Sequence, residues 1–191
     1  MGGCGGCNRG RPGFGFGNDV RHFVRRVLED SSNRPAVVDA DGLNVLAPFT
    51  AEFKTRAKPL ILTPHPGEFA RLTGCSADDV RTRREELAVA FASNNGVVLL
   101  LKGAGTLVTD GARLYRNSTG NPGMATGGSG DVLTGAIAAL LAQGFAPFDA
   151  AVLGAWVHGR AGDFASAALG ATGLTAADIV EHLPAAFRDR E

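Results

Sequence analysis

Cysteine is scarce in this 191-residue sequence, and the few cysteines do not form a recognisable set. Cys4, Cys7 and Cys75 are an odd number and no secretion signal accompanies them, which argues against a disulfide framework. Cys4 and Cys7 have the spacing of half a zinc site, but no second pair of ligands follows. We therefore expect an unstructured N-terminal tail and no bound metal there.

Net charge and long apolar runs are also missing. Nineteen Lys and Arg residues balance 19 Asp and Glu residues, whereas a protein that binds polyanions by counterion release needs a basic surface. No uninterrupted apolar run approaches the roughly 20 residues of a membrane helix. Residues 1–17 are glycine-rich and lack the apolar core of a signal peptide. These absences predict a cytoplasmic protein with no nucleic-acid or membrane partner.

What is present indicates one soluble α/β domain. The hydrophobic share of 45% and the charged share of 20% are ordinary for a globular protein. Short apolar, β-branched runs alternate with helical signals, which is typical of a layered α/β fold. The expected strands are residues 35–40, 59–63 and 97–101, followed by a hairpin of residues 107–109 and 114–116 around the turn Asp110-Gly111.

Helical signals fill the rest of the chain. A capping box at Ser76 predicts a helix that runs to the stop signal at residues 94–96. Residues 131–143 are apolar nearly all round, which predicts a helix buried on most sides. The many small residues of 148–169 predict a tightly packed helix pair. Thr175 and Asp178 cap a final helix that is expected to stop at Pro184.

The most informative stretch is the glycine-rich segment 117–131, which runs straight into the apolar helix. A pliable backbone beside the unpaired N–H groups and the positive dipole end of a helix can bind phosphate or another anion. Neither a P-loop nor a dinucleotide fingerprint fits the spacing. The alternative is a glycine-rich connection without a ligand.

Three side chains could take part in ligand binding or catalysis. Asp131 lies in the first helical turn, where the dipole favours a carboxylate even without function. It could equally take a proton from a substrate hydroxyl beside a bound phosphoryl group. His65 stands between two prolines with Glu68 nearby, and Lys102 ends the strongest strand. Each could contact a ligand or be structural. The remaining histidines, His22, His158 and His182, fall in helical patterns and are interpreted as structural.

With these motifs in order, the chain resembles the NAD(P)H-hydrate dehydratase family, which is related to ribokinase-like kinases. The resemblance covers about residues 13 to 187. It is carried by residues 37–44 (Val-Val-Asp-Ala-Asp-Gly-Leu-Asn), 62–69 (Leu-Thr-Pro-His-Pro-Gly-Glu-Phe), 101–106 (Leu-Lys-Gly-Ala-Gly-Thr), 121–131 (Asn-Pro-Gly-Met-Ala-Thr-Gly-Gly-Ser-Gly-Asp) and 158–163 (His-Gly-Arg-Ala-Gly-Asp). It implies a ribokinase-like three-layer α/β/α fold with a mostly parallel central sheet.

The resemblance also implies a reaction. The substrate would be the S epimer of hydrated NADH or NADPH, whose ring hydroxyl is phosphorylated by ADP or ATP before phosphate is eliminated. Asp131 would be the base, and Gly17, His65 and Asp131 would contact the hydrated cofactor. The nucleotide would contact two segments, made of Lys102, Gly103, Ala104, Gly105 and Thr106, and of Asn121, Gly123, Met124, Ala125, Thr126, Gly127, Gly128, Ser129 and Gly130.

The form of the histidine loop resembles the bacterial branch and favours ADP over ATP. Mg²⁺ bridging the phosphates is expected from the chemistry, although no carboxylate cage can be assigned to it. Family members tend to form homo-oligomers, so a homo-oligomer is a further expectation.

The sequence departs from the family at its start. The family's usual Gly-Pro-Gly-Leu-Gly stands here as Gly-Phe-Gly-Phe-Gly in residues 13–17. Residues 1–11 do not resemble the strand–loop–helix opening that the family carries earlier. We therefore expect residues 1–12 to be a disordered or non-homologous tail, and residues 13–191 to be a domain that lacks its N-terminal strand–helix units. Such a domain would expose an apolar edge and flank.

Two other functions share these motifs. A ribokinase-like kinase for a small vitamin-precursor alcohol would use the same helix start but keep its phosphorylated product. The histidine loop argues against that kinase. A truncated fragment that binds nucleotide without turnover is the non-enzymatic alternative.

Overall fold

A computed structural model describes residues 18–189, and five strands in this part form one sheet in the order β1-β2-β3-β4-β5. β1, β2 and β3 run parallel, whereas β4 pairs antiparallel with β3 and with β5. The strands are β1 (Ala36–Val38), β2 (Leu60–Leu62), β3 (Val98–Leu101), β4 (Leu107–Thr109) and β5 (Leu114–Arg116). The expected α/β fold is confirmed, with a mixed sheet whose parallel half precedes the predicted hairpin.

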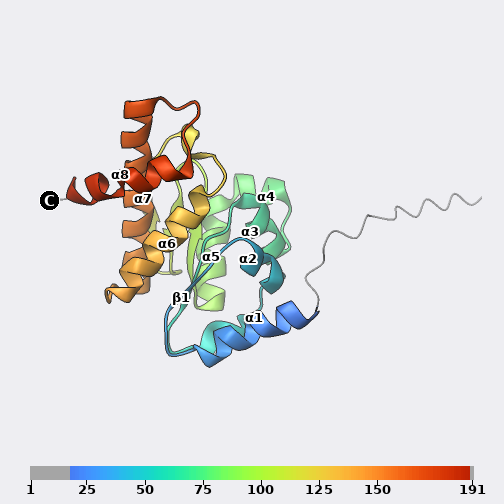
Figure 1. Cartoon of the computed structure of the whole chain (residues 1–191). Helices are drawn as coiled ribbons and strands as arrows, with labels where there is room; N and C mark the ends of the chain where they lie inside the picture. Colours follow the sequence, from blue (N-terminus) through green and yellow to red (C-terminus); the bar gives the residue numbers. More distant parts are fainter. Residues whose placement is uncertain (1–17, 190–191) are drawn as a thin grey trace, which may run out of the picture.

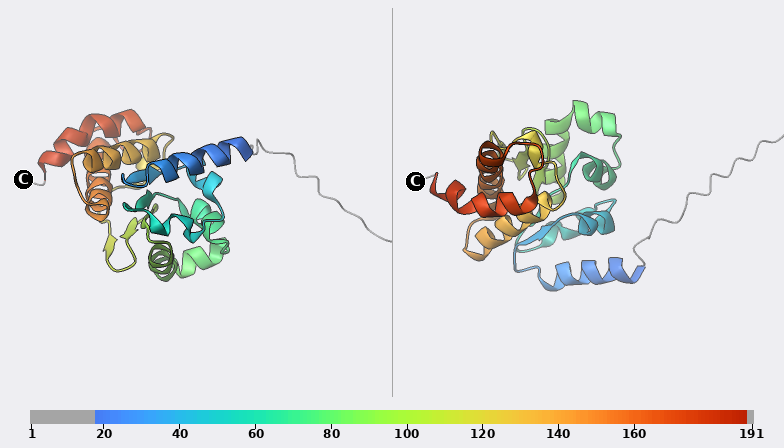
Figure 2. Two further views of the ribbon diagram at one scale, coloured as in Figure 1. Left: turned by 90° about the horizontal axis from the view of Figure 1, so that it is seen from below. Right: turned by 45° about the horizontal axis from the view of Figure 1, so that its top comes forward.

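Helices cover both faces of this sheet, which gives three layers (Figure 1). One face carries α6 and α7, with α8 packed outside them, and the other carries α2 to α5, with α1 beside α2 in both views of Figure 2. The helices are α1 (Asn18–Asp30), α2 (Asp41–Leu46), η1 (Ala51–Thr55), α3 (Pro66–Thr73), α4 (Ala77–Thr82), α5 (Arg84–Asn95), η2 (Pro122–Met124), α6 (Ser129–Ala142), α7 (Pro147–Leu169) and α8 (Ala176–Arg188).

The parallel strands β1, β2 and β3 are apolar throughout because helices cover both faces of this part of the sheet. Successive side chains of a strand point to opposite faces. In β2, Leu60 and Leu62 join the core beneath α2 to α5, whereas Ile61 joins the core beneath α6 and α7. Continuous apolar runs such as these are typical of strands covered on both sides.

The helix predicted from Ser76 is two helices. Its predicted start is confirmed, because Ser76 and Asp79 form a reciprocal capping box at α4. Gly96, in the left-handed conformation, ends α5 as expected. Between them the backbone of Arg83 leaves helical geometry at φ −118°, so α4 stops and α5 starts anew. The sequence around Arg83 contains neither glycine nor proline, so nothing in it signals this break.

The prediction that the helix beginning near residue 131 is buried on most sides was wrong. In α6 only one stripe is buried, formed by Ser129, Leu133, Ile137 and Leu140. The opposite side, which carries Gly135, Ala138 and Ala139, is exposed. An apolar groove separates this side from α8, lined among others by Val132, Ala136, Val180, Leu183 and Phe187.

Two further helix predictions were wrong in extent. Residues 147–169 form the single helix α7 and not a helix pair. α8 begins at the predicted Thr175–Asp178 capping box but continues through Pro184 to Arg188. A proline costs a helix one backbone hydrogen bond. Ile179 lies before Pro184 and Ala186 lies after it, and both pack onto α7. This packing keeps the two halves of α8 in line.

Glycines on α7 allow segment 117–124 to lie directly on the helix. A Cβ placed on Gly159 would lie 2.3 Å from Oγ1 of Thr119, and one on Gly162 would lie 2.2 Å from the sulfur of Met124. The Thr119 hydroxyl donates to the carbonyl of Trp156 at 2.8 Å. The small residues of α7 therefore serve this close approach.

His158 joins α7 to the first turn of α6. The imidazole is buried, and its Nε2 lies 2.9 Å from the carbonyl oxygen of Ser129. That contact requires a proton on Nε2. Burial lowers the pKa of His158 to about 4, the bond to Ser129 opposes this, and the positive charge of Lys102 adds to the lowering. The side chain is therefore a neutral donor at pH 7, which agrees with the structural interpretation.

Apolar surface remains exposed on α1. Val20, Phe23 and Val27 are exposed on that helix, and β1 beside it pairs only with β2 among residues 18–189. A cavity between α1 and β1 is lined mainly by apolar side chains, including Val24 and Val37. No helix in the described part of the chain is long and apolar enough to span a membrane.

We predict that Gly159→Ala destabilises the protein by about 1–3 kcal/mol, because the methyl group would overpack against Thr119. Gly135→Ala is the matched control. Gly135 lies inside α6 with open space where a Cβ would stand. Alanine there should stabilise the protein by up to about 1 kcal/mol through helix propensity. Urea denaturation measures both, and equal effects of the two substitutions would contradict the close packing.

His158 predicts a specific loss of stability in acid. The pKa of His158 in the folded protein, about 4, lies below the ordinary value of 6.5. Its contribution to the free energy of unfolding is therefore complete above pH 6.5 and is lost as pH falls toward 4. The shift corresponds to about 3 kcal/mol. His158→Gln keeps an N–H donor but cannot titrate. Between pH 7 and pH 4 the unfolding free energy of the wild type should fall by up to about 3 kcal/mol more than that of the variant. Equal falls would refute this assignment.

Candidate functional site

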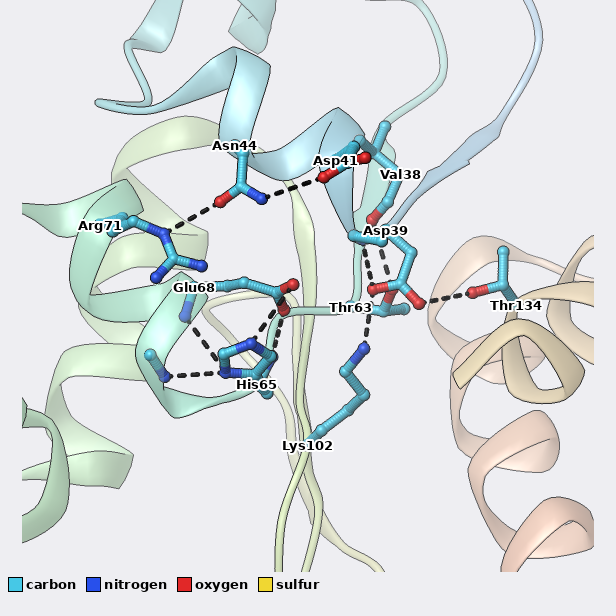
Figure 3. Close-up of polar contacts among 12 residues, drawn as sticks. Val38, Asp39, Asp41, Asn44, Thr63, His65, Glu68, Arg71, Lys102 and Thr134 are labelled. Carbon is cyan, nitrogen blue, oxygen red and sulfur yellow. Dashed lines mark hydrogen bonds and ion pairs between the residues drawn. The ribbon is translucent and has the colours of Figure 1, made fainter. Parts of the chain in front are cut away.

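Polar side chains gather where the parallel strands end and α6 begins. Asp39 follows β1, His65 lies just beyond β2, and Lys102 follows β3. Their strand ends share one edge of the sheet because the three strands are parallel neighbours. Thr134 reaches the same place from α6 (Figure 3). Open α/β sheets place their ligands at this edge.

An ion pair between Lys102 and Asp39 forms the centre of this group. The Lys102 ammonium donates to Oδ1 of Asp39 at 2.7 Å, and the Thr134 hydroxyl donates to Oδ2 at 3.0 Å. The side chain of Lys102 is 22% exposed and that of Asp39 10% exposed. The pair is therefore mostly shielded from water, but one side remains reachable.

The first turn of α6 lies against this pair. Gly128 is the N-cap, in the left-handed conformation at φ 84°, and no side chain caps the helix. A Cβ on Gly130 would lie 3.4 Å from both Oδ2 of Asp39 and the Lys102 nitrogen. Within residues 18–189 the N–H of Gly130 has no hydrogen-bond acceptor, while those of Ser129 and Asp131 bond to preceding carbonyls. The positive end of the helix is therefore open to an anion.

Asp131 follows Gly130 in the first turn of α6. It is exposed, and no side chain within the described residues pairs with its carboxylate. The carboxylate is therefore available to a substrate.

The turn at residues 102–106 is exposed at its central residues, and Arg84 holds its backbone in place. Arg84 donates to the carbonyl oxygens of Ala104 and Leu101, both at 2.8 Å. Burial lowers the pKa of the Arg84 guanidinium. Thr106 donates its hydroxyl to the carbonyl of Gly103, and its own carbonyl accepts from the N–H of Asn117. Thr106, in the first segment predicted to bind nucleotide, is thus bonded to Asn117, which precedes the second segment.

Segment 121–126 is anchored to α7 by Asp163. The Asn121 amide donates to Oδ1 of Asp163 and to the carbonyl of Gly162, both at 3.0 Å. The N–H of Gly120 donates to the other carboxylate oxygen at 2.9 Å. Asn121 therefore has a structural role in shaping the loop.

His65 is the N-cap of α3. Its Nδ1 accepts from the N–H groups of Gly67 at 3.0 Å and Glu68 at 3.3 Å, while Glu68 accepts from the N–H of His65 at 2.8 Å. Nδ1 as an acceptor leaves a proton of the neutral ring on Nε2. The ring is 52% exposed, and the buried Glu68 carboxylate lies 3.5 Å from Nε2. The loop is stiff and presents one face of the imidazole to solvent.

The predicted residues thus fall into separate groups. Lys102 meets the first turn of α6 directly, whereas His65 belongs to the neighbouring strand end and Asn121 faces α7. Gly17 lies outside the described residues. Sequence reasoning left Asp39, Thr134, Arg84 and Asp163 out of the predicted site. Asp39 could have been included, because it follows a parallel strand and belongs to the motif of residues 37–44.

This arrangement has the elements of an anion site built for group transfer. The unpaired N–H of Gly130 and the Lys102 ammonium lie at the start of α6, and the exposed carboxylate of Asp131 belongs to the same turn. Amides and ammonium can hold a phosphoryl group, and the carboxylate can accept a proton from a nucleophile.

Comparison with known proteins agrees with this geometry. The sequence profile of the NAD(P)H-hydrate dehydratase family matches residues 12–185. The bifunctional NAD(P)H-hydrate repair enzyme of Moorella thermoacetica is 52% identical over 159 residues, which cover 82% of this chain and 30% of that protein. The ADP-dependent (S)-NAD(P)H-hydrate dehydratase of Neisseria meningitidis is 42% identical over 172 residues, covering 87% of this chain and 58% of that protein.

A solved structure shares the fold. The ADP/ATP-dependent NAD(P)H-hydrate dehydratase of Bacillus subtilis, co-crystallised with ATP and Mg²⁺, superposes with a TM-score of 0.82 at 33% identity. The match covers 91% of this chain and 61% of that one. This chain therefore spans less than two thirds of each of these relatives. The family profile and the relatives, however, match nearly all of it, and the chain belongs to the NAD(P)H-hydrate dehydratase family.

Proposed function

We propose that this chain catalyses the nucleotide-dependent dehydration of hydrated NADH or NADPH, the S epimer, and so repairs a damaged cofactor. The observation that carries the proposal is the uncapped start of α6, where the unpaired N–H of Gly130 lies beside the Lys102 ammonium and the exposed Asp131 follows in the same turn. The names of the Neisseria and Bacillus relatives support the same reaction.

The reaction has two steps. The ring hydroxyl of the hydrated cofactor attacks the terminal phosphorus of ADP, Asp131 takes the hydroxyl proton, and AMP leaves. The carbon–oxygen bond of the phosphate ester then breaks, the neighbouring ring carbon loses a proton, and the double bond and inorganic phosphate form. The unpaired Gly130 N–H, the positive end of α6 and Lys102 would offset the charge that develops on the transferred phosphoryl group.

The two remaining segments suit the nucleotide. The exposed residues Gly103–Gly105 and the loop Asn121–Gly127, which leads into α6, would contact the nucleotide. The form of the His65 loop favours ADP over ATP. His65 would contact the hydrated cofactor, and we also propose a cytoplasmic location.

Mg²⁺ fits this site through the nucleotide itself. Among the described residues no three His, Cys, Asp or Glu side chains gather to hold a metal. Mg²⁺ in such sites keeps several waters and is bound largely by substrate phosphates, so a dedicated protein cage is not needed. Bound there, the ion would neutralise phosphate charge.

The proposal predicts recovery of reduced cofactor. Hydrated NADH incubated with the protein, ADP and Mg²⁺ should regain its absorbance at about 340 nm, with one phosphate released per cofactor. No recovery, with phosphate transferred instead to a hydroxymethylpyrimidine or thiazole alcohol, would identify a small-molecule kinase. Folded protein that ADP stabilises against heat, but that converts neither substrate, would identify a nucleotide-binding fragment.

Asp131→Asn should lower kcat by about 10²–10⁴-fold, the usual contribution of a general base. The dissociation constant of ADP, measured by calorimetry, should change little, because the amide keeps the shape of the side chain. Asp149→Asn is the matched control, since Asp149 is another exposed acid in a first helical turn, that of α7. Unchanged turnover in the Asp131 variant would remove that residue from its role.

A further inference from the structure

We propose that Asp39 and Thr134 are positioning residues that hold the Lys102 ammonium at the start of α6, where it meets the transferred phosphoryl group. The proposal rests on the proposed function for the identity of that group. Asp39 and Thr134 would act through Lys102 and not by touching the nucleotide.

Geometry gives the first argument. Asp39 and Lys102 are 63 positions apart and come from the ends of β1 and β3, which are not neighbours in the sheet. Both carboxylate oxygens are used, one by Lys102 and the other by Thr134. Figure 3 shows the side chain of Lys102 extending from its strand end toward the Asp39 carboxylate, with Thr134 on the other side of that carboxylate. The carboxylate therefore fixes the distance between the lysine and α6.

Electrostatics gives the second argument. A cation at the N-terminus of a helix is unfavourable, because the helix end itself carries partial positive charge. The Lys102 nitrogen nevertheless lies 3.4 Å from where a Cβ of Gly130 would stand. A buried ion pair contributes little to stability compared with an apolar pair of similar size. Folding stability does not account for this placement, whereas a ligand anion held between the two positive groups does.

The backbone beside Asp39 gives the third argument. Ala40 has φ 48° and is the one non-glycine residue with positive φ in the described part of the chain. Such a conformation is strained and persists where the surroundings demand it. Asp39 immediately precedes the N-cap of α2, yet α2 has no side-chain cap. Oδ1 of Asp39 accepts from the backbone N–H of Ala40 at 2.8 Å as well as from Lys102, so the turn at Ala40 holds the carboxylate against the lysine.

A double-mutant cycle tests the coupling. Asp39→Asn should lower kcat about 10–100-fold with the KM of the hydrated cofactor nearly unchanged, which is the size expected for losing one aligned donor. Lys102→Met should lower kcat at least as much. The double variant should be no slower than Lys102→Met alone, because Asp39 acts only through the lysine. Thr134→Val should give a smaller loss in the same direction.

The matched control is Glu52→Gln, which breaks the partly buried Arg25–Glu52 pair on another part of the molecule. It should leave kcat unchanged. Losses that multiply in the Asp39 and Lys102 double variant would overturn the proposal, as would wild-type kcat in Asp39→Asn.

A second measurement needs no turnover. The chain has three lysines, Lys54, Lys58 and Lys102, and the first two are exposed. Trace acetylation with acetic anhydride, read by mass spectrometry, reports the reactivity of Lys102 relative to the other two. Asp39→Asn should raise that ratio several-fold, because the freed ammonium moves into solvent. An unchanged ratio overturns the positioning role. A wild type without dehydratase activity would overturn the proposed function alone, and the labelling ratio would then decide whether Asp39 holds the lysine.

Discussion

The site depends on two positive groups being held close together. The start of α6 and the ammonium of Lys102 repel each other, and the Asp39 carboxylate between them makes the arrangement stable in the free protein. This balance requires the parallel pairing of β1, β2 and β3, because only that pairing brings Asp39 and Lys102 to one edge of the sheet. If a phosphoryl group binds there as we propose, it meets groups already in place, and little ordering is needed during the reaction.

The helices behind the site serve the same arrangement. His158 holds the first turn of α6 from α7, and its burial keeps it neutral. A charged imidazole there would place a third positive group near Lys102. The glycines of α7 let segment 117–124 rest on the helix, and Asp163 fixes the loop through Asn121. The small residues of α7 and the glycine-rich segment are therefore two halves of one packing contact.

Much of the fold could be predicted from local signals. The strands, the hairpin and the capping boxes at Ser76 and Thr175 follow from short patterns whose physical causes act within a few residues. The errors arose where distant packing decides. The break at Arg83, the continuation of α8 through Pro184 and the open side of α6 depend on neighbours that the local sequence does not reveal.

The candidate site divides in the same way. The glycine-rich turn, Asp131 and Lys102 could be named from the sequence because their surroundings are local. The partnership of Lys102 with Asp39 and Thr134 could not, since it joins residues 63 and 95 positions apart and needs the strand order. Strand order in a sheet with crossover helices is a property of the whole domain. Family membership supplied the reaction, and the structure supplied the partners of the lysine.

The most direct test is a crystal structure of the protein with ADP and Mg²⁺. The account predicts that an oxygen of the terminal phosphate lies within hydrogen-bond distance of the Gly130 N–H and of the Lys102 ammonium, with Asp131 facing the open side of the phosphorus. A terminal phosphate bound elsewhere on the chain, or an α6 start closed against Lys102 with the nucleotide bound, would contradict it.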